Sequence, residues 1–347
     1  MSQSQKSFSV SGTLESYTAD GYYCELLGCD SAPAEHNSRI IDRIAGLNSE
    51  DLIRRSREAE RDLYNLGITF TVYTENAAID RILPFDVIPR TLSRSEWVEL
   101  ESGIKQRVAA INLFLADIYG PAKIQADGGI PEELGIVNSN YRPIMRDIKV
   151  RHGTYVHICG IDIVRDEAGQ FRVLEDNART PSGVSYVVEN RHTMRRTFPD
   201  LLQGEGIREV DDYGLLLVEA LSADAPEDAE DVHVVLLSPG IYNSAYFEHV
   251  FLAREMGVPL VEGSDLIVTD DDIVYMKTTA GLQRVHSIYR RLNDDFLDPE
   301  AFNPESMLGV PGLMRAYKAG TVSLANAVGT GVADDKAVYA YMPRIIK

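Results

Sequence analysis

Residues 160–179 constrain the fold of this chain more than any other stretch of its 347 residues. They read GIDIVRDEAGQFRVLEDNAR, two runs of alternating apolar and polar residues joined by a short segment that contains glycine. Such alternation is typical of β-strands, and glycine in a short connection favours a tight turn. The pattern therefore predicts an antiparallel β-hairpin whose loop is residues 167–170.

The register of this hairpin brings three oxygen-bearing side chains together. With residues 167–170 as the loop, Asp162 lies directly opposite Glu175. Opposed side chains share one face of a sheet, with Cβ atoms about 5 Å apart. Asn177 lies two residues after Glu175 and so points to the same face. We expect Asp162, Glu175 and Asn177 to converge.

Two facing carboxylates repel each other, and a cation between them reverses the sign of the interaction. Mg²⁺ prefers oxygen ligands and usually takes a few protein groups together with phosphate oxygens. The pattern therefore predicts that Asp162, Glu175 and Asn177 bind a metal. The alternative is a solvated acidic face, in a chain with 53 acidic and 34 basic residues.

The spacing of these residues resembles the magnesium motif of ATP-grasp ligases, such as the D-alanine–D-alanine ligases. Arg179 resembles the last residue of the Glu-x-Asn-x-Arg motif of biotin carboxylases, where it helps to hold or polarise the reacting carboxyl group. The following TPSGVS, residues 180–185, resembles the substrate loop that comes after this motif. The resemblance implies catalytic roles for Arg179, Ser182 and Gly183, the last two as donors that steady an oxyanion and shape the acceptor site.

A fuller resemblance is to the circularly permuted, type 2 ATP-grasp family related to glutathionylspermidine synthase. Five blocks in order carry it: PFDVIPR at 84–90, LEDNARTPSG at 174–183, SPGIYNSAYFEH at 238–249, LGVPGL at 308–313 and ANAVGTGVADDK at 325–336. The resemblance implies a carboxylate–amine ligase that uses ATP and Mg²⁺ and proceeds through an acyl phosphate. Its substrates would be a small-molecule or peptide carboxylate and an amine.

This sequence departs from the family pattern at the nucleotide clamp. In permuted members, a strand lysine and a glycine-rich loop follow the equivalent of Lys336, whereas this sequence ends at Lys347. No GxxxxGK[ST] loop replaces them. We therefore expect a fragment, a truncated form or a degenerate gene product, and the residues that bind the nucleotide are unknown.

The resemblance and the element pattern together predict an α+β and α/β fold: a circularly permuted ATP-grasp with a Rossmann-like pre-ATP-grasp lobe and N-terminal helices. We expect a mainly helical region at 1–145, the metal-binding hairpin and following helices at 146–221, an acidic linker or loop at 222–231, the Rossmann-like lobe at 232–300 and a lead-in to the clamp at 301–347.

Helix signals are strongest at two places. Residues 49–66 form a candidate helix with Ser49 as N-cap and Gly67 as its stop, and residues 94–119 have a capping box of Ser93 and Glu96. Strand, helix and strand follow each other over 232–261, a unit of an open α/β sheet. We expect further helices at 189–202 and 213–220, and strands at 68–73, 266–269, 273–277 and 285–289.

Three residues are predicted to bind substrate. Asn243 stands where a helix N-terminus could hold an anion, although it could equally be an ordinary cap of a helix that runs to Met256. Arg290 could clamp a carboxylate, with an ion pair to Asp294 or Asp295 as the alternative. Arg90 has the same ambiguity, with Asp86 as the alternative partner.

Composition excludes several classes of function. A net charge of −19 repels phosphate backbones, so nucleic acid is an unexpected partner. No run of 18 apolar residues and no apolar signal core occur, and we expect no membrane association. The cysteines Cys24, Cys29 and Cys159 suggest reduced thiols in a cytoplasmic protein. Two other functions stay open: a non-catalytic binding or assembly module, and a hydrolase that uses Asp162 and Glu175.

Overall fold

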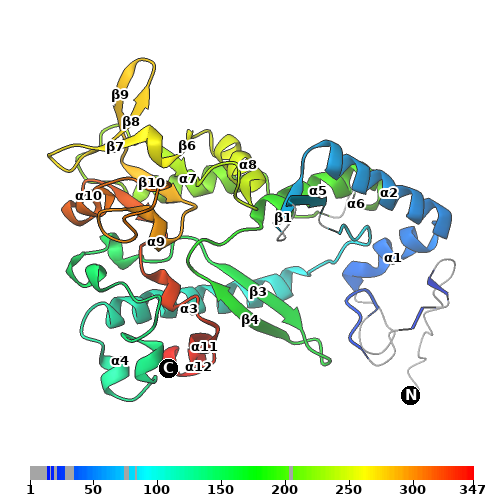
Figure 1. The fold of residues 1–347 in the computed structure, drawn as a ribbon. Coiled ribbons are helices and arrows are strands. Elements are labelled where there is room, and N and C mark those ends of the chain that lie inside the picture. The colour runs from blue at the N-terminus through cyan, green and yellow to red at the C-terminus, as the bar shows by residue number, and fades with distance from the viewer. Residues whose placement is uncertain are drawn as a thin grey trace. The chain divides into compact units, whose positions relative to one another are not determined.

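The computed structural model describes residues 14–15, 17–18, 22–27, 35–73, 78–82, 84–202 and 206–347 (Figure 1). Cys29 and the polar start of the sequence, residues 1–12, lie outside the described residues. The chain divides into two compact units. The first comprises Met1–Ser102, Ile163–Leu174 and Tyr186–Val210, and the second comprises Gly103–Asp162, Glu175–Ser185 and Asp211–Lys347.

Two helices follow each other near the start of the first unit, and one of them was predicted. After the short 3₁₀ turn η2 (Glu35–Asn37) come α1 (Ser38–Ala45) and α2 (Ser49–Asn65), which confirms the helix predicted at 49–66. Its predicted cap is wrong by one residue: the side chain of Asn48 accepts the N–H of Asp51 at 2.7 Å. Asn48 has extended backbone angles, which an N-cap requires, while Ser49 is already helical.

The first unit also contains a two-stranded sheet and the helices that follow the hairpin. Strands β1 (Thr69–Tyr73) and β2 (Ala78–Ile82) pair antiparallel, and β2 was not predicted. Helix α5 (Val184–Thr197) begins in the second unit and continues into the first, where α6 (Pro199–Leu202) follows it. A small apolar core packs Ile40, Ile41 and Ile44 of α1 against Met194 of α5 and Phe198.

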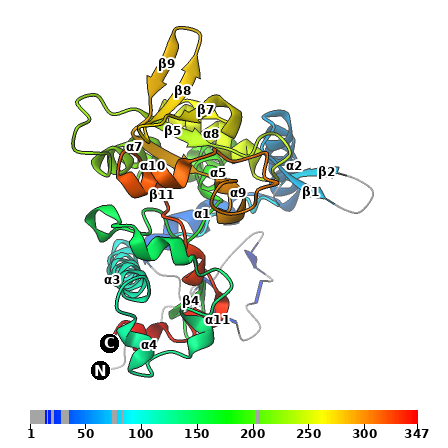
Figure 2. The same ribbon diagram turned by 60° about the vertical axis from the view of Figure 1, so that its left-hand side comes forward.

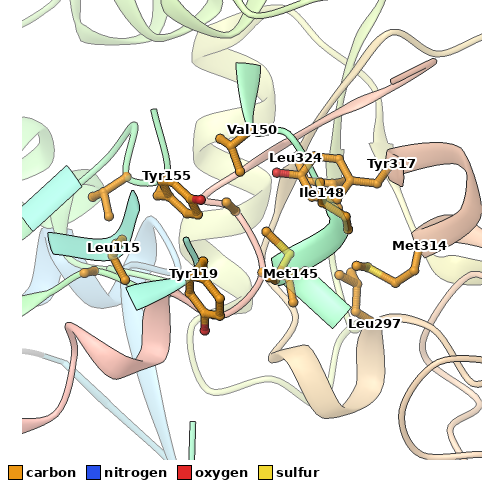
Figure 3. Close-up of a cluster of buried hydrophobic side chains, with 14 of the residues drawn as sticks. Leu115, Tyr119, Met145, Ile148, Val150, Tyr155, Leu297, Met314, Tyr317 and Leu324 are labelled. Carbon is orange, nitrogen blue, oxygen red and sulfur yellow. The ribbon is translucent and has the colours of Figure 1, made fainter. Parts of the chain in front are cut away.

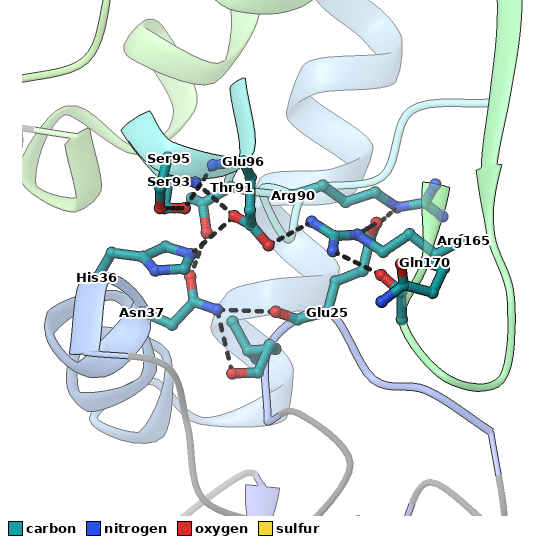
Figure 4. A network of polar contacts seen from close by, with 12 residues as sticks. Glu25, His36, Asn37, Arg90, Thr91, Ser93, Ser95, Glu96, Arg165 and Gln170 are labelled. Atoms are coloured by element: carbon teal, nitrogen blue, oxygen red, sulfur yellow. Dashed lines mark hydrogen bonds and ion pairs between the residues drawn. The ribbon is translucent and has the colours of Figure 1, made fainter. Parts of the chain in front are cut away.

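Helix α3 (Arg94–Ile118) runs from the first unit into the second. The predicted capping box is confirmed, because Ser93 N–H donates to Glu96 at 2.7 Å and Glu96 N–H donates to Ser93 Oγ at 3.2 Å. Figure 4 shows that Glu96 also binds Arg165, which reaches Glu25 as well, at 2.9 and 3.1 Å. The end of α3 is the buried part: Ile111, Phe114, Leu115 and Ile118 are at most 2% exposed.

A four-stranded parallel sheet organises the second unit (Figure 2). Its order is β11 (Ser323–Ala325), β10 (Ser287–Arg290), β5 (Val234–Leu237) and β6 (Leu260–Val261), and each neighbouring pair is parallel. All four residues of β5 are apolar and buried, as is typical of a parallel strand that is covered on both faces. The strand–helix–strand prediction for 232–261 is confirmed, with α8 (Tyr246–Met256) between β5 and β6.

The start of α8 differs from the prediction. Ala245, not Asn243, precedes the first helical residue, and the side chain of Asn243 accepts the N–H of Ala245 at 2.9 Å. This short Asx-type turn leads the chain into the helix. Gly257 ends α8 as predicted, with a φ of 66° that favours glycine.

Shorter elements complete the second unit. Helix α7 (Tyr213–Ala223) precedes β5; β7 (Leu266–Val268), β8 (Val274–Thr278) and β9 (Gly281–Arg284) form an antiparallel sheet. The remaining helices are α4 (Lys123–Ala126), α9 (Asp294–Leu297), α10 (Leu313–Ala319), α11 (Lys336–Tyr339) and α12 (Met342–Ile345), with 3₁₀ turns η3 (Glu132–Leu134), η4 (Pro143–Asp147), η5 (Arg151–Gly153), η6 (Gly263–Asp265) and η7 (Thr330–Val332). The acidic segment 222–231 lies within this unit.

One large apolar core holds the second unit together (Figure 3). Leu115 lies in α3 and Tyr119 follows this helix directly. Both belong to the same core as Met145, Tyr155 and Leu324, which come from three other parts of the chain. Each such side chain contributes about 1.5–3 kcal/mol when it is fully buried. The core therefore anchors the segment before the hairpin and the end of β11 to the same body. Among the described residues, no helix is long and apolar enough to cross a membrane.

Candidate active site

The hairpin predicted from alternation is present, but its loop differs from the predicted 167–170, because Gln170 pairs with Asp166 and the connection is residues 167–169. Strands β3 (Gly160–Arg165) and β4 (Phe171–Asn177) form a two-stranded sheet, seen side by side in Figure 1. Asp166 shapes the turn: its N–H donates to Gln170 O at 3.0 Å, and its carbonyl accepts the N–H of Gly169 at 2.9 Å. Gly169 has a φ of 75°, a conformation that glycine adopts without strain.

The three predicted metal ligands converge on one face of the hairpin, within the second unit. Asn177 Nδ2 donates to Asp162 Oδ1 at 3.4 Å and to Gly160 O at 3.2 Å. The carboxyl group of Glu175 is within hydrogen-bond reach of Asp162 and Asn177. The three side chains therefore lie close together, and their role as metal ligands stays a prediction.

Asp176, between two of these residues, faces the other way and serves the fold. Its side chain is 1% exposed, and Arg107 of α3 binds both carboxyl oxygens at 2.6 Å. Strand alternation thus separates the acids of β4 into one buried, paired group and one group directed to the candidate site.

A lysine supplies positive charge at the converging carboxylates. Lys336 Nζ lies 2.9 Å from Glu175 Oε2, and the lysine side chain is 76% exposed. Lys336 holds the pKa of Glu175 below its usual value. Burial, and then the neighbouring Glu175, raise the pKa of Asp162. The carboxylates therefore already have one cationic partner, the ammonium of Lys336.

The donor set also fits Mg²⁺ in kind. Two carboxylates and one amide oxygen are hard ligands, and the remaining positions of the ion could go to phosphate oxygens or water. Among the described residues, no cluster of three or more His, Cys, Asp or Glu side chains is placed to hold a metal. A metal on this face would therefore depend on Asn177 and on groups from outside the chain.

Arg179 is held next to this face by Asp334. One oxygen of the Asp334 carboxylate accepts the N–H groups of Ala178 and Arg179, at 2.7 and 3.2 Å. The other lies 3.6 Å from the Arg179 guanidinium. The sequence analysis assigned no role to Asp334 or Lys336, although both belong to the block at 325–336. Only their contacts with the hairpin, far away in the sequence, identify them.

The predicted oxyanion donor Gly183 is engaged elsewhere. Its N–H donates to Glu248 Oε2 at 2.7 Å, and the N–H and Oγ of Ser185 donate to the same oxygen at 3.2 and 2.8 Å. The first N–H groups of α5 have no partner within the helix, and the buried carboxylate of Glu248 provides one. Ser182 is exposed. Of the two predicted donors, only the Ser182 hydroxyl faces solvent.

Arg290 is structural in this fold. It is fully buried and donates to the carbonyls of Asn326 and Ala327 at 2.7 and 2.9 Å, and it pairs with Asp294 at 2.9 Å. The predicted contact with a substrate carboxylate is therefore wrong, and the alternative ion pair is present. The guanidinium of Arg290 is buried, and protein groups already occupy it.

Arg90 and Asn243 both lie away from the hairpin ligands in the sequence, and each has a local partner. Arg90 belongs to the first unit, is 79% exposed and lies 3.5 Å from Glu25 (Figure 4). Its expected alternative partner, Asp86, instead accepts the N–H of Ile88. Asn243 belongs to the second unit, in the loop after β5, and forms the turn that leads into α8.

Residues directly after two parallel strands meet the hairpin and its following loop. Asn326, after β11, binds the backbone on either side of the hairpin, and Arg291, after β10, donates to Pro181 O. Ligands of open α/β sheets bind outside the carboxyl ends of the strands. The candidate metal face is therefore attached to the sheet at the end where such folds bind their ligands.

Comparisons with known proteins show which family the chain resembles. A family model described as a circularly permuted ATPgrasp matches residues 89–347. An uncharacterized protein of Synechocystis sp. is 50% identical over 96% of this chain, and one of Mycobacterium tuberculosis is 47% identical over 89%. A Frankia casuarinae protein, provisionally named glutamate–cysteine ligase 2-2, is 39% identical over 96% of the chain. The chain spans 69%, 55% and 38% of the lengths of these three relatives.

Proposed function

Because this chain belongs to the circularly permuted ATP-grasp family, we propose that it carries the metal-binding part of an ATP- and Mg²⁺-dependent ligase. The reaction would join a carboxylate to an amine through an acyl phosphate. The observation that carries the proposal is the shared face of Asp162, Glu175 and Asn177. The provisional ligase name of the Frankia relative supports the reaction class. In this proposal the parallel sheet is the pre-ATP-grasp lobe.

Asp162, Glu175 and Asn177 would hold the metal ion. When bound, Mg²⁺ neutralises phosphate charge as the γ-phosphoryl group is transferred. In this structure the Nδ2 of Asn177 faces the carboxylate of Asp162, so the amide would have to turn to offer Oδ1. The exposed ammonium of Lys336 is attached to the chain by a flexible stem and could move from Glu175 to a phosphate oxygen.

Arg179 and Ser182 would act on the reacting groups. The guanidinium of Arg179, oriented by Asp334, would bind the reacting carboxylate and offset the charge that develops on it. The exposed hydroxyl of Ser182 would shape the acceptor site, while the N–H of Gly183 keeps the loop in place through Glu248. Asn243 and Arg90 remain proposed contacts for the acid or amine substrate.

A second candidate function has one observation in its favour. Lys336 already compensates the charge of Glu175, so the face is stable without a metal. A non-catalytic binding or assembly module that retains the ATP-grasp fold would keep this pair. Titration of the full-length protein with Mg·ATP by calorimetry separates the two functions, because only the ligase requires binding.

The metal role is tested by Mn²⁺ binding, followed by electron paramagnetic resonance. We expect Glu175→Gln to weaken Mn²⁺ binding about tenfold or more, because it removes one charged ligand. Glu167→Gln is the matched control, since Glu167 is exposed in the turn of the same hairpin. Equal Mn²⁺ affinities for wild type and Glu175→Gln would show that this face binds no metal. Release of ADP with candidate acids and amines then tests the ligase reaction.

A further inference from the structure

The side chain of Asn326 lies between the two arms of the hairpin. This residue follows β11 directly and is 1% exposed. Its Oδ1 accepts the N–H groups of His157 and Ile158 at 2.8 and 2.9 Å. Its Nδ2 donates to the carbonyls of Ile158 and Ala178 at 2.6 and 2.9 Å. One carboxamide therefore binds the chain where it enters the hairpin and where it leaves.

These contacts lie next to the candidate metal ligands. Asp162 follows Ile158 by four residues, and Asn177 directly precedes Ala178. A two-stranded hairpin is only marginally stable by itself, and its open end separates most easily. The ligands stand at that open end. The spacing of the two arms there depends on what joins them, and Asn326 is bound to both.

The position of Asn326 is itself held rigidly. Arg290, which is fully buried, donates to the backbone carbonyl of Asn326 at 2.7 Å and is paired with Asp294. The role that the sequence suggested for Arg290 as a substrate clamp is thus replaced by a supporting one. Asn326 therefore connects the parallel sheet to both arms of the hairpin and fixes where the hairpin lies relative to the sheet.

Only a carboxamide satisfies this position. It must accept two N–H groups on one side and donate to two carbonyls on the other, which asparagine does with its oxygen and its NH₂ group. Aspartate would direct an oxygen at the two carbonyls. An apolar residue of similar size would leave all four buried backbone groups without partners, at about 1–3 kcal/mol each.

We propose that Asn326 is a positioning residue that sets the distance between the two chain segments carrying Asp162 and Asn177. It acts through backbone groups and touches neither metal nor substrate. The functional consequence rests on the proposed metal site. The positioning itself is a property of the hairpin alone and is measured without any metal.

Asn112 on α3 offers a closely matched control. Its Oδ1 accepts the N–H groups of Tyr155 and Val156 at 2.7 and 2.9 Å, and its Nδ2 donates to Val156 O at 3.3 Å and to Val108 O at 3.2 Å. The residue type is the same, and Asn326 makes one bond more, a long one from its Nδ2 to Arg179 O at 3.5 Å. Asn112 differs in binding only the entering arm. Asn112→Asp therefore disturbs a similar amide network without touching the chain that leaves β4.

The test compares Asn326→Asp and Asn112→Asp by hydrogen exchange of the backbone amides in the whole chain. We expect exchange at residues 175–179 to become about tenfold faster or more in Asn326→Asp and to stay within about threefold of wild type in Asn112→Asp, because only the former loses a bond to the leaving arm. Equal exchange at 175–179 in the two variants would overturn the proposal. Should either aspartate variant fail to fold, the pair Asn326→Ser and Asn112→Ser is compared in the same way.

Mn²⁺ binding gives the second readout. We expect Asn326→Asp to bind Mn²⁺ about tenfold more weakly than wild type and Asn112→Asp to bind it within about threefold, because only the former displaces the ligands. Wild-type affinity in Asn326→Asp would contradict the proposal. Absence of Mn²⁺ binding in the wild type would instead refute the proposed function, and the exchange comparison would then decide the role of Asn326 by itself.

Discussion

The substitution Glu248→Gln tests how the loop after the hairpin is held. Glu248 is fully buried, and its two carboxyl oxygens have different tasks. One lies 2.9 Å from the guanidinium of Arg291, which is itself 2% exposed. The other accepts three donors, the N–H of Gly183 and the N–H and Oγ of Ser185. Arg291 also binds the carbonyl of Pro181 and the hydroxyl of Tyr289 at 2.9 Å.

The expected cost follows from these contacts. Glutamine has one oxygen and one NH₂ group, so in either orientation its NH₂ meets donors, on Arg291 or on the start of α5. The charge of Arg291 also remains buried without a counter-charge. Breaking a buried ion pair by removing one partner costs about 3–5 kcal/mol. Because the free energy of unfolding of a domain is only about 5–15 kcal/mol, we expect the second unit of this variant to be only marginally stable.

The assay is urea denaturation followed by far-UV circular dichroism. Glu255→Gln is the control, since Glu255 lies on the same helix, is 33% exposed and pairs with Arg254 at 3.3 Å. Exposed pairs contribute about 0–1 kcal/mol, so this variant should unfold almost as the wild type does. Hydrogen exchange at Gly183 and Ser185 should accelerate only in Glu248→Gln. A loss of stability no larger than that of Glu255→Gln would refute the reasoning.

Three further predictions concern other groups of the second unit. Burial and Arg291 lower the pKa of His249 from 6.5 to about 3, so the unfolded chain binds a proton below pH 6.5 that the folded chain does not. Stability should therefore fall as the pH decreases, by about 2 kcal/mol between pH 7 and pH 5, and His249→Gln should remove this dependence in urea denaturation. Arg107→Gln should cost about 3–5 kcal/mol, measured in the same way, because it leaves the buried Asp176 unpaired; an unchanged midpoint would contradict this. Asp334→Asn should cost only about 1 kcal/mol, because amide oxygens still accept hydrogen bonds, but it should abolish any ATP-dependent turnover that requires an oriented Arg179.

Local patterns predicted much of the fold. The alternation in 160–179 predicted the hairpin, because successive side chains of a strand point to opposite faces. The predicted loop is wrong by one residue, so the meeting of Asp162 with Glu175 is known from the structure and not from the predicted register. The capping box at Ser93 is equally local, since both hydrogen bonds join residues three apart. The residues predicted to cap α2 and α8 were wrong, because several neighbouring polar residues can accept the same kind of N–H group.

The partners of individual charged side chains could not be predicted in the same way. Arg290 and Arg291 are adjacent, and the sequence left open whether Arg290 forms an ion pair or binds a substrate. In the structure Arg290 supports Asn326 and Arg291 binds Glu248, because alternate residues around the end of β10 face different parts of the unit. Burial of a charge depends on which distant groups pack against it, and no local period contains that information.

The amino-acid sequence by itself determined the period-two and helical segments, the family to which the chain belongs and the hairpin that carries the three oxygen donors. The tertiary structure alone decided which groups hold that face in place: Lys336 at Glu175, Asp334 at Arg179, Glu248 at Gly183 and Asn326 between the two arms. The physical reason is that hydrogen bonds and ion pairs act over about 3 Å. Residues far apart in the chain reach that distance only after the core has folded.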